Sequence, residues 1–177
     1  MSLKSNFKLM ADYNQWINER VYRAASQLSA DELSKDRGAF FGSIIGTLNH
    51  ILVGDTIWLQ RFAEHPAHFK ALDYVRILDK PIALDSIMYA EFKDLESARA
   101  TMDRVIKDFC DELSDEVLST HLSYHNTKGD RFRKNFGHLV QHFFNHQTHH
   151  RGQVSTLLNQ AGIDIGVTDL LVSIPDD

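Results

Sequence analysis

Four long stretches of the sequence repeat apolar residues at steps of three and four, the spacing that places them on one face of an α-helix. Glycine and proline weaken or end helices, and the 177 residues include only 9 glycines and 3 prolines. We therefore expect long helices at residues 3–28, 41–62, 86–113 and 134–161. Amphipathic helices bury their apolar faces against one another, so the sequence predicts an all-α four-helix bundle that forms a single domain over residues 1–177.

The connections between these segments are expected to be mostly irregular. Ser29 and Glu32 have the spacing of a capping box, which predicts a short turn of helix after the first long one. Residues 65–84 have mixed character and are expected to form a loop, and the tail from residue 163 shows no helical period. Residues 118–133 contain a Thr-Lys-Gly-Asp turn, which allows a small hairpin before the last long helix.

The composition excludes several classes of protein. The net charge is −5 with histidine neutral, and no basic stripe is present, whereas nucleic-acid binding relies on neutralising phosphates. No apolar run approaches the ~18 residues that span a bilayer, and no apolar secretory segment follows the first residues. Cys110 is the only cysteine, which excludes a disulfide framework. We expect a cytoplasmic protein that binds neither nucleic acid nor a membrane.

Histidines recur every four residues along the last predicted helix, at His138, His142, His146 and His150. A four-residue step keeps side chains on nearly the same helix face, so two imidazoles so spaced can reach one metal ion. From the angular positions, His150 points into the apolar stripe, His146 lies at its edge, and His138 and His149 face water. His142 is intermediate.

A further histidine, His50, lies in the middle of the second predicted helix. Its position falls on a second, glycine-rich face of that helix, which must point at the last helix if the histidines share a metal ion. A three-histidine site would leave a coordination position open, as catalytic zinc sites do. The alternative is a set of structural histidines that are hydrogen-bonded inside the bundle, and the spacing alone leaves both interpretations open.

Four motifs carry a resemblance to a known family. The longest is Asn-His-Gln-Thr-His-His-Arg-Gly-Gln at residues 145–153. Tyr-Asn-Gln-Trp-Ile-Asn at 13–18, Thr-Leu-Asn-His-Ile-Leu at 47–52 and Val-Thr-Asp-Leu-Leu at 167–171 follow the same order. Together they resemble the DinB family of metal-binding four-helix proteins over nearly the whole chain.

The resemblance implies an up-down-down-up bundle, often a homodimer, with a metal site formed by His50, His146 and His150. The metal in this family is usually Zn²⁺ or Ni²⁺. Family members have been described as metal-dependent hydrolases, and some relatives are thiol S-transferases or thiol-dependent isomerases. No residue of this chain is assigned as a catalytic acid or base.

Three functions follow from these observations. The first is a metal-dependent enzyme that activates a low-molecular-weight thiol or water against a small-molecule substrate, with thiol transfer favoured over hydrolysis. The second is a non-catalytic metal-binding or ligand-binding module of a stress response. The third is a purely structural bundle whose histidines have no ligand.

Other motif residues have more than one possible role. Asp55 orients a ligand histidine, pairs with Arg61 or bonds a neighbouring helix. Arg151 either binds an anionic substrate group or forms a surface ion pair. Gln153 and Asn49 are candidate hydrogen-bond partners near the metal, and His142 is a candidate spare ligand.

The remaining assignments concern packing. Trp16 and Trp58 are expected in the core, and Cys110 is expected to be a small buried apolar residue. Asn14 and Asn18 face one way and either rim the pocket or bridge two helices.

Overall fold

The computed structural model describes residues 2–176, and four long helices form most of it. The chain is mostly helical, as predicted, with one small antiparallel hairpin. The long helices are α1 (Leu3–Ala25), α3 (Ile44–Ala63), α5 (Phe92–Glu112) and α7 (Phe136–Gln160). The shorter helices are α2 (Ala30–Ser34), η1 (Lys70–Leu72), α4 (Asp73–Arg76), α6 (Asp115–Ser119) and η2 (Leu170–Ser173).

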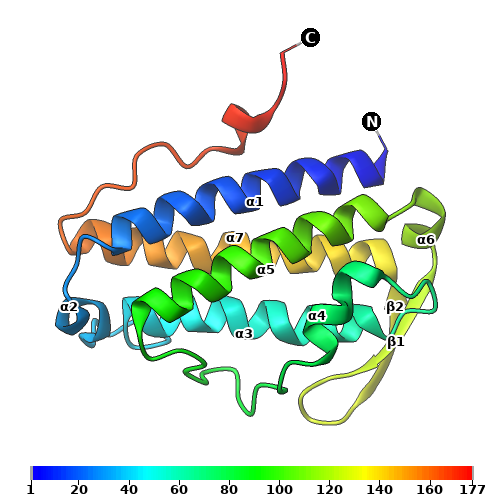
Figure 1. Cartoon of the computed structure of the whole chain (residues 1–177), viewed down its shortest axis with the longest axis horizontal. Coiled ribbons are helices and arrows are strands. Elements are labelled where there is room, and N and C mark those ends of the chain that lie inside the picture. The colour runs from blue at the N-terminus through cyan, green and yellow to red at the C-terminus, as the bar shows by residue number, and fades with distance from the viewer. Residues whose placement is uncertain (1, 177) are drawn as a thin grey trace.

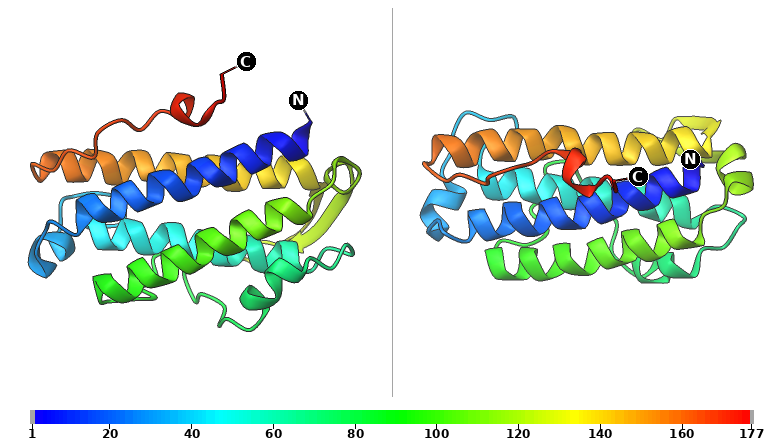
Figure 2. Two further views of the ribbon diagram at one scale, coloured as in Figure 1. Left: turned by 45° about the horizontal axis from the view of Figure 1, so that its top comes forward. Right: turned by 90° about the horizontal axis from the view of Figure 1, so that it is seen from above.

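The four long helices pack side by side (Figure 1). Helix α1 contacts α5 and α7, and α3 contacts α7 and α5. Figures 1 and 2 show α1 and α7 running in one direction and α3 and α5 in the other, while the C-terminal tail passes over α1. Among the described residues, no helix is long and apolar enough to cross a membrane.

The predicted hairpin is present. Strand β1 (His121–His125) pairs antiparallel with β2 (Arg131–Asn135), and Tyr124 lies opposite Phe132. Because β2 extends to Asn135, α7 begins two residues later than expected. The Asn135 side chain caps this helix by accepting a hydrogen bond from the His138 backbone amide at 3.0 Å.

The segment between the second and third long helices differs from the prediction. The third long helix begins at Phe92 and not at residue 86, because the side chain of Asn49 on α3 bonds both the amide and the carbonyl of Tyr89, at 3.0 Å each, which ties this segment to α3. The expected loop at residues 65–84 contains the short helices η1 and α4.

Aromatic side chains form the core beneath the hairpin. The fully buried Phe62 of α3 meets Phe109 of α5 and both Phe136 and Phe143 of α7, with ring centroids 5.3–5.9 Å apart. Rings at such distances attract one another in addition to the area that they bury. This cluster therefore joins three of the four long helices. The buried Cys110 agrees with its predicted role.

The two tryptophans pack less deeply than expected. Trp16 and Trp58 are only half buried and lie against the edge of the core.

We predict that Phe62→Ala lowers the free energy of unfolding by ~3–5 kcal/mol, because it removes a buried ring and leaves a cavity between three helices. Urea denaturation followed by circular dichroism measures this change. Phe40→Ala is the matched control, since Phe40 is 87% exposed and its loss should cost less than ~0.5 kcal/mol. Equal effects of the two substitutions would contradict the assignment of Phe62 to the core.

Candidate metal centre

The structure brings His50 of α3 together with His146 and His150 of α7. The Nε2 atom of His50 lies 3.2 Å from Nε2 of His146 and 3.1 Å from Nε2 of His150. One ring nitrogen from each of the three residues lies within 4.8 Å of the others. Residues about 100 positions apart in the sequence thus form a group that could bind a metal ion.

Gly54 allows the two helices to approach closely enough for this group to form. It lies one turn after His50, and a Cβ atom at this position would lie only 2.5 Å from Cε1 of His146. The glycine-rich face of α3 therefore points at α7, as a shared metal site requires.

Hydrogen bonds orient two of the three imidazoles. Nδ1 of His50 donates to the carbonyl oxygen of Leu84 at 2.7 Å, and Nδ1 of His150 donates to Oε1 of Gln153 at 2.8 Å. A ring whose Nδ1 carries the proton presents a lone pair at Nε2. The lone pairs of His50 and His150 thus face each other across 3.1 Å and repel, unless a cation or a proton lies between them.

The two nitrogen separations from His50 fit a bound metal ion. Bonds of ~2.0–2.1 Å that meet at the tetrahedral angle place ligand nitrogens ~3.3 Å apart. The observed 3.1 and 3.2 Å are close to this value. The donor set is chemically suitable as well, because imidazole nitrogens bind zinc and nickel, although they do not distinguish between the two.

The electrostatic environment keeps the three imidazoles neutral. Burial lowers the pKa of His50 and of His150 below the ordinary value. Burial, and then the neighbouring His150 and His50, lowers the pKa of His146 to about 3. Neutral imidazoles can act as ligands without first losing a proton.

The comparison with known proteins agrees with these features. The model of the DinB family matches residues 1–175. The chain belongs to the DinB family. It is similar to Protein DinB of Bacillus subtilis (strain 168), with 25% identity over 166 residues that cover 92% of this chain and 90% of the relative. DinB membership and the three-histidine group together fit a metal-binding DinB-like protein.

The other histidines of α7 in this DinB-family protein lie outside the group. His138 and His149 are exposed, as predicted. His142 packs edge-on against Trp58, and its ring centroid lies 6.4 Å from that of His146. His142, expected as a spare ligand, is therefore not one of the three converging residues.

Phe41 was missed as a residue of the site. It was assigned to the second helix, but α3 begins after Ser43, whose side chain caps the helix by accepting from the Gly46 amide at 3.0 Å. Phe41 lies in the preceding turn and stacks on His50, with ring centroids 3.7 Å apart and planes 16° apart. Ser43 is a favoured capping residue, and this signal could have placed the helix start correctly.

Asp55 takes one of its three predicted roles, because it bonds neighbouring helices. It is fully buried, forms an ion pair with Arg99 of α5, and accepts hydrogen bonds from Nε2 of Gln147 at 2.9 and 3.0 Å. Arg61, its expected partner, instead stacks over Trp58. Asp55 thus acts on the site only indirectly, through Gln147, the neighbour of His146.

The surface ion pair predicted for Arg151 was wrong, because this side chain is buried. Its guanidinium is buried, donates to Oδ1 of Asn14, and lies 5.7 Å from the ring centroid of Tyr13. Asn14 and Asn18 of α1 donate to Oδ1 of Asp103 on α5 at 3.0 and 2.9 Å, so the two asparagines bridge helices.

We predict that the purified protein binds about one Zn²⁺ or Ni²⁺ per chain, and that His50→Ala, His146→Ala or His150→Ala lowers the affinity at least ~100-fold. Gln153→Ala should lower it ~10–100-fold, because Gln153 orients His150. Calorimetric titration of metal-free protein measures these affinities. The control is His138→Ala, which removes an exposed histidine of the same helix. A loss of affinity in the control as large as in His150→Ala would contradict the assignment.

We also predict that the metal-free protein becomes less stable as the pH is lowered from 7 to 5. The pKa of His146 is depressed to about 3 in the folded state and is ~6.5 when unfolded. The unfolded chain therefore binds more protons in this window, and the stability present above pH 6.5 is lost as the pH falls. The contribution is at most ~1 kcal/mol per pH unit after solvent screening. Urea denaturation with a chelator present should give a shallower pH dependence for His146→Gln than for His138→Gln, and identical slopes would refute this prediction.

Proposed function

We propose that this DinB-family protein is a metal-dependent enzyme in which His50, His146 and His150 hold Zn²⁺ or Ni²⁺. The convergence of three neutral imidazoles, two of them with fixed lone pairs facing each other, supports this proposal most directly. When bound, such an ion supplies Lewis-acid chemistry and lowers the pKa of a water or thiol at its remaining position.

The surrounding residues would prepare the site for this chemistry. The Leu84 carbonyl and Gln153 hold the rings of His50 and His150 in the orientation that a ligand needs. Phe41 covers one face of the His50 ring and excludes water there. Three neutral ligands leave the charge of a divalent ion uncompensated, which favours an anionic partner such as a thiolate or hydroxide.

We favour thiol S-transfer over hydrolysis as the reaction. Hydrolysis benefits from a general base, and the buried carboxylate of Asp55 is already engaged by Arg99 and Gln147. A thiolate needs no base once it has lost its proton. In such a transfer, the low-molecular-weight thiol first loses its proton to solvent. The thiolate sulfur then forms a bond to an electrophilic carbon of the small-molecule substrate, and the bond to the leaving group breaks as that group departs with its electron pair.

A second function is a non-catalytic metal-binding or ligand-binding module of a stress response. It is favoured by the same observation, because Asp55 is engaged by Arg99 and Gln147 and is not free to act as a general base. A protein of this kind would hold a regulatory ligand without transferring protons. The homodimer implied by the family resemblance stays a prediction for either function, and light scattering with and without metal would measure the oligomeric state.

We predict that metal-loaded protein conjugates a low-molecular-weight thiol such as cysteine to an electrophile such as 1-chloro-2,4-dinitrobenzene, which releases chloride. His150→Ala should lower the rate at least ~100-fold, whereas His138→Ala should leave it within ~2-fold. Absorbance of the thioether product measures the rate, and ester hydrolysis is assayed in parallel. Equal rates in the wild type and His150→Ala would exclude this enzymatic function, and metal binding without turnover would favour the binding module.

A further inference from the structure

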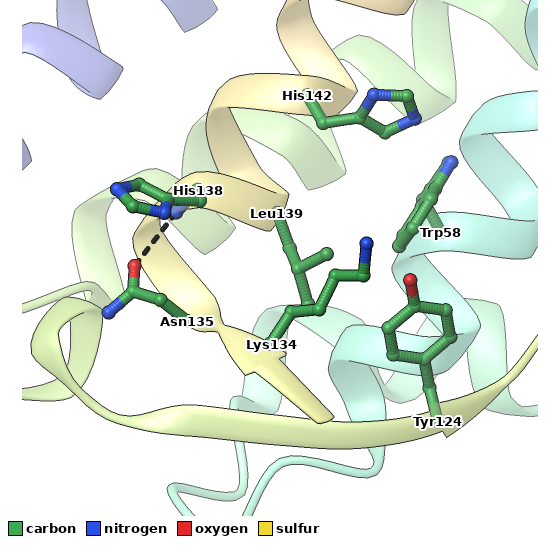
Figure 3. Close-up of a pocket in the computed structure, with 7 residues that line it drawn as sticks. All are labelled: Trp58, Tyr124, Lys134, Asn135, His138, Leu139 and His142. Atoms are coloured by element: carbon green, nitrogen blue, oxygen red, sulfur yellow. Dashed lines mark hydrogen bonds between the residues drawn. The ribbon is translucent and has the colours of Figure 1, made fainter. Parts of the chain in front are cut away.

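A cleft of about 510 Å³ lies between the hairpin and the helix pair α3–α7 (Figure 3). It is separate from the three converging histidines, and none of them lines it. Its walls come from α3, both strands and the first turns of α7. The lining residues are Trp58, Tyr124, Lys134, Asn135, His138, Leu139 and His142.

One part of the cleft is apolar and aromatic. The ring centroids of Trp58 and Tyr124 lie 5.4 Å apart, at an interplanar angle of 59°. Leu139 of α7 also lines the cleft. Trp58 is half buried, so part of its ring remains accessible. Flat apolar groups pack well against such surfaces.

The charged groups at the cleft are cationic. Figure 3 shows the amine of Lys134 pointing into the space between Trp58, Tyr124 and His142, whereas His138 and Asn135 point to the other side of Leu139. The guanidinium of Arg61 lies 4.6 Å from the Trp58 ring centroid and 5.2 Å from that of Tyr124.

Within the described part of the chain, no ion pair neutralises these two cationic side chains. No acidic side chain lines the cleft, and no ion pair within residues 2–176 includes Lys134 or Arg61. A chain with a net charge of −5 thus has a local cationic site, which suits an anion.

The cleft adjoins the candidate metal centre through His142. The ring of His142 lies 5.0 Å from the ring centroid of Trp58 on one side and 6.4 Å from that of His146 on the other. The four-residue step from His142 to His146 rises only ~6 Å along α7. A molecule that fills the cleft and extends past His142 would therefore reach the three histidines.

We propose that this cleft binds an aromatic carboxylate, with the ring against Trp58 and Tyr124 and the carboxylate at Lys134, and that it positions such a substrate beside the metal centre. The role as a substrate rests on the function proposed above, whereas the binding itself does not. The amine of Lys134 would donate to the carboxylate, and Arg61 would add to the positive potential.

The test compares 2-naphthoate with its neutral analogue 2-naphthamide by calorimetric titration at low salt. We expect naphthoate to bind at least ~5-fold more tightly than the amide, because only the carboxylate can pair with Lys134. Lys134→Gln should remove this preference, and Lys128→Gln, which changes a hairpin lysine outside the cleft, should preserve it. Trp58→Leu should weaken both probes.

Binding is measured in His150→Ala as well as in the metal-loaded wild type. Unchanged naphthoate affinity in this variant supports the cleft, because a carboxylate held by the metal ion would be lost with it. Loss of binding in His150→Ala, equal affinities for the two probes, or no binding up to ~5 mM would each overturn the proposal. Since no turnover is measured, a failure of the enzymatic function leaves this test intact.

Discussion

The close approach of α3 and α7 is the interaction on which the candidate metal centre depends. Without a side chain at Gly54, the imidazole of His146 lies directly against α3, one turn from His50. The ring nitrogens then come within 3.2 Å of each other although they belong to different helices. Any larger residue at position 54 would have to displace the ring of His146, so helix packing and ligand geometry are set by the same contact.

The apolar periodicity of the sequence predicted the four long helices but did not predict where they begin and end. Apolar repeats indicated all four long helices because each one buries a continuous stripe. The start of α5 could not be read in this way, since Asn49 binds the backbone of Tyr89 from another helix. A contact between residues 40 positions apart leaves no periodic signal in the segment that it holds.

The metal centre was also predicted only in part. The four-residue spacing of the histidines on α7 and the position of His50 indicated a shared metal site, and the family resemblance identified His50, His146 and His150 as its ligands. The partners of Asp55 and Arg151 could not be predicted, because Arg99 and Asn14 lie on helices whose relative rotation was unknown. A charged residue between apolar neighbours can be exposed or paired, and only the neighbouring helix decides which applies.

Buried ion pairs also hold the helices in place. Arg99 on α5 lies between Asp55 of α3 and Asp103 of its own helix, and Asn18 extends the contacts to α1. Removing one partner of a buried pair leaves a charge without compensation, which typically costs ~3–5 kcal/mol. These contacts therefore favour one relative arrangement of α1, α3 and α5 over others that would bury the same apolar area.

The two oriented histidines differ in the source of their hydrogen-bond partner. His150 depends on the side chain of Gln153, whereas His50 is held by the main-chain carbonyl of Leu84, which every amino acid at that position would supply. The exposed segment around Leu84 can thus accumulate substitutions without losing its hold on His50. Mutational tolerance therefore differs around the site: substitutions are permitted in the loop that contains Leu84 and restricted at Gln153 of α7.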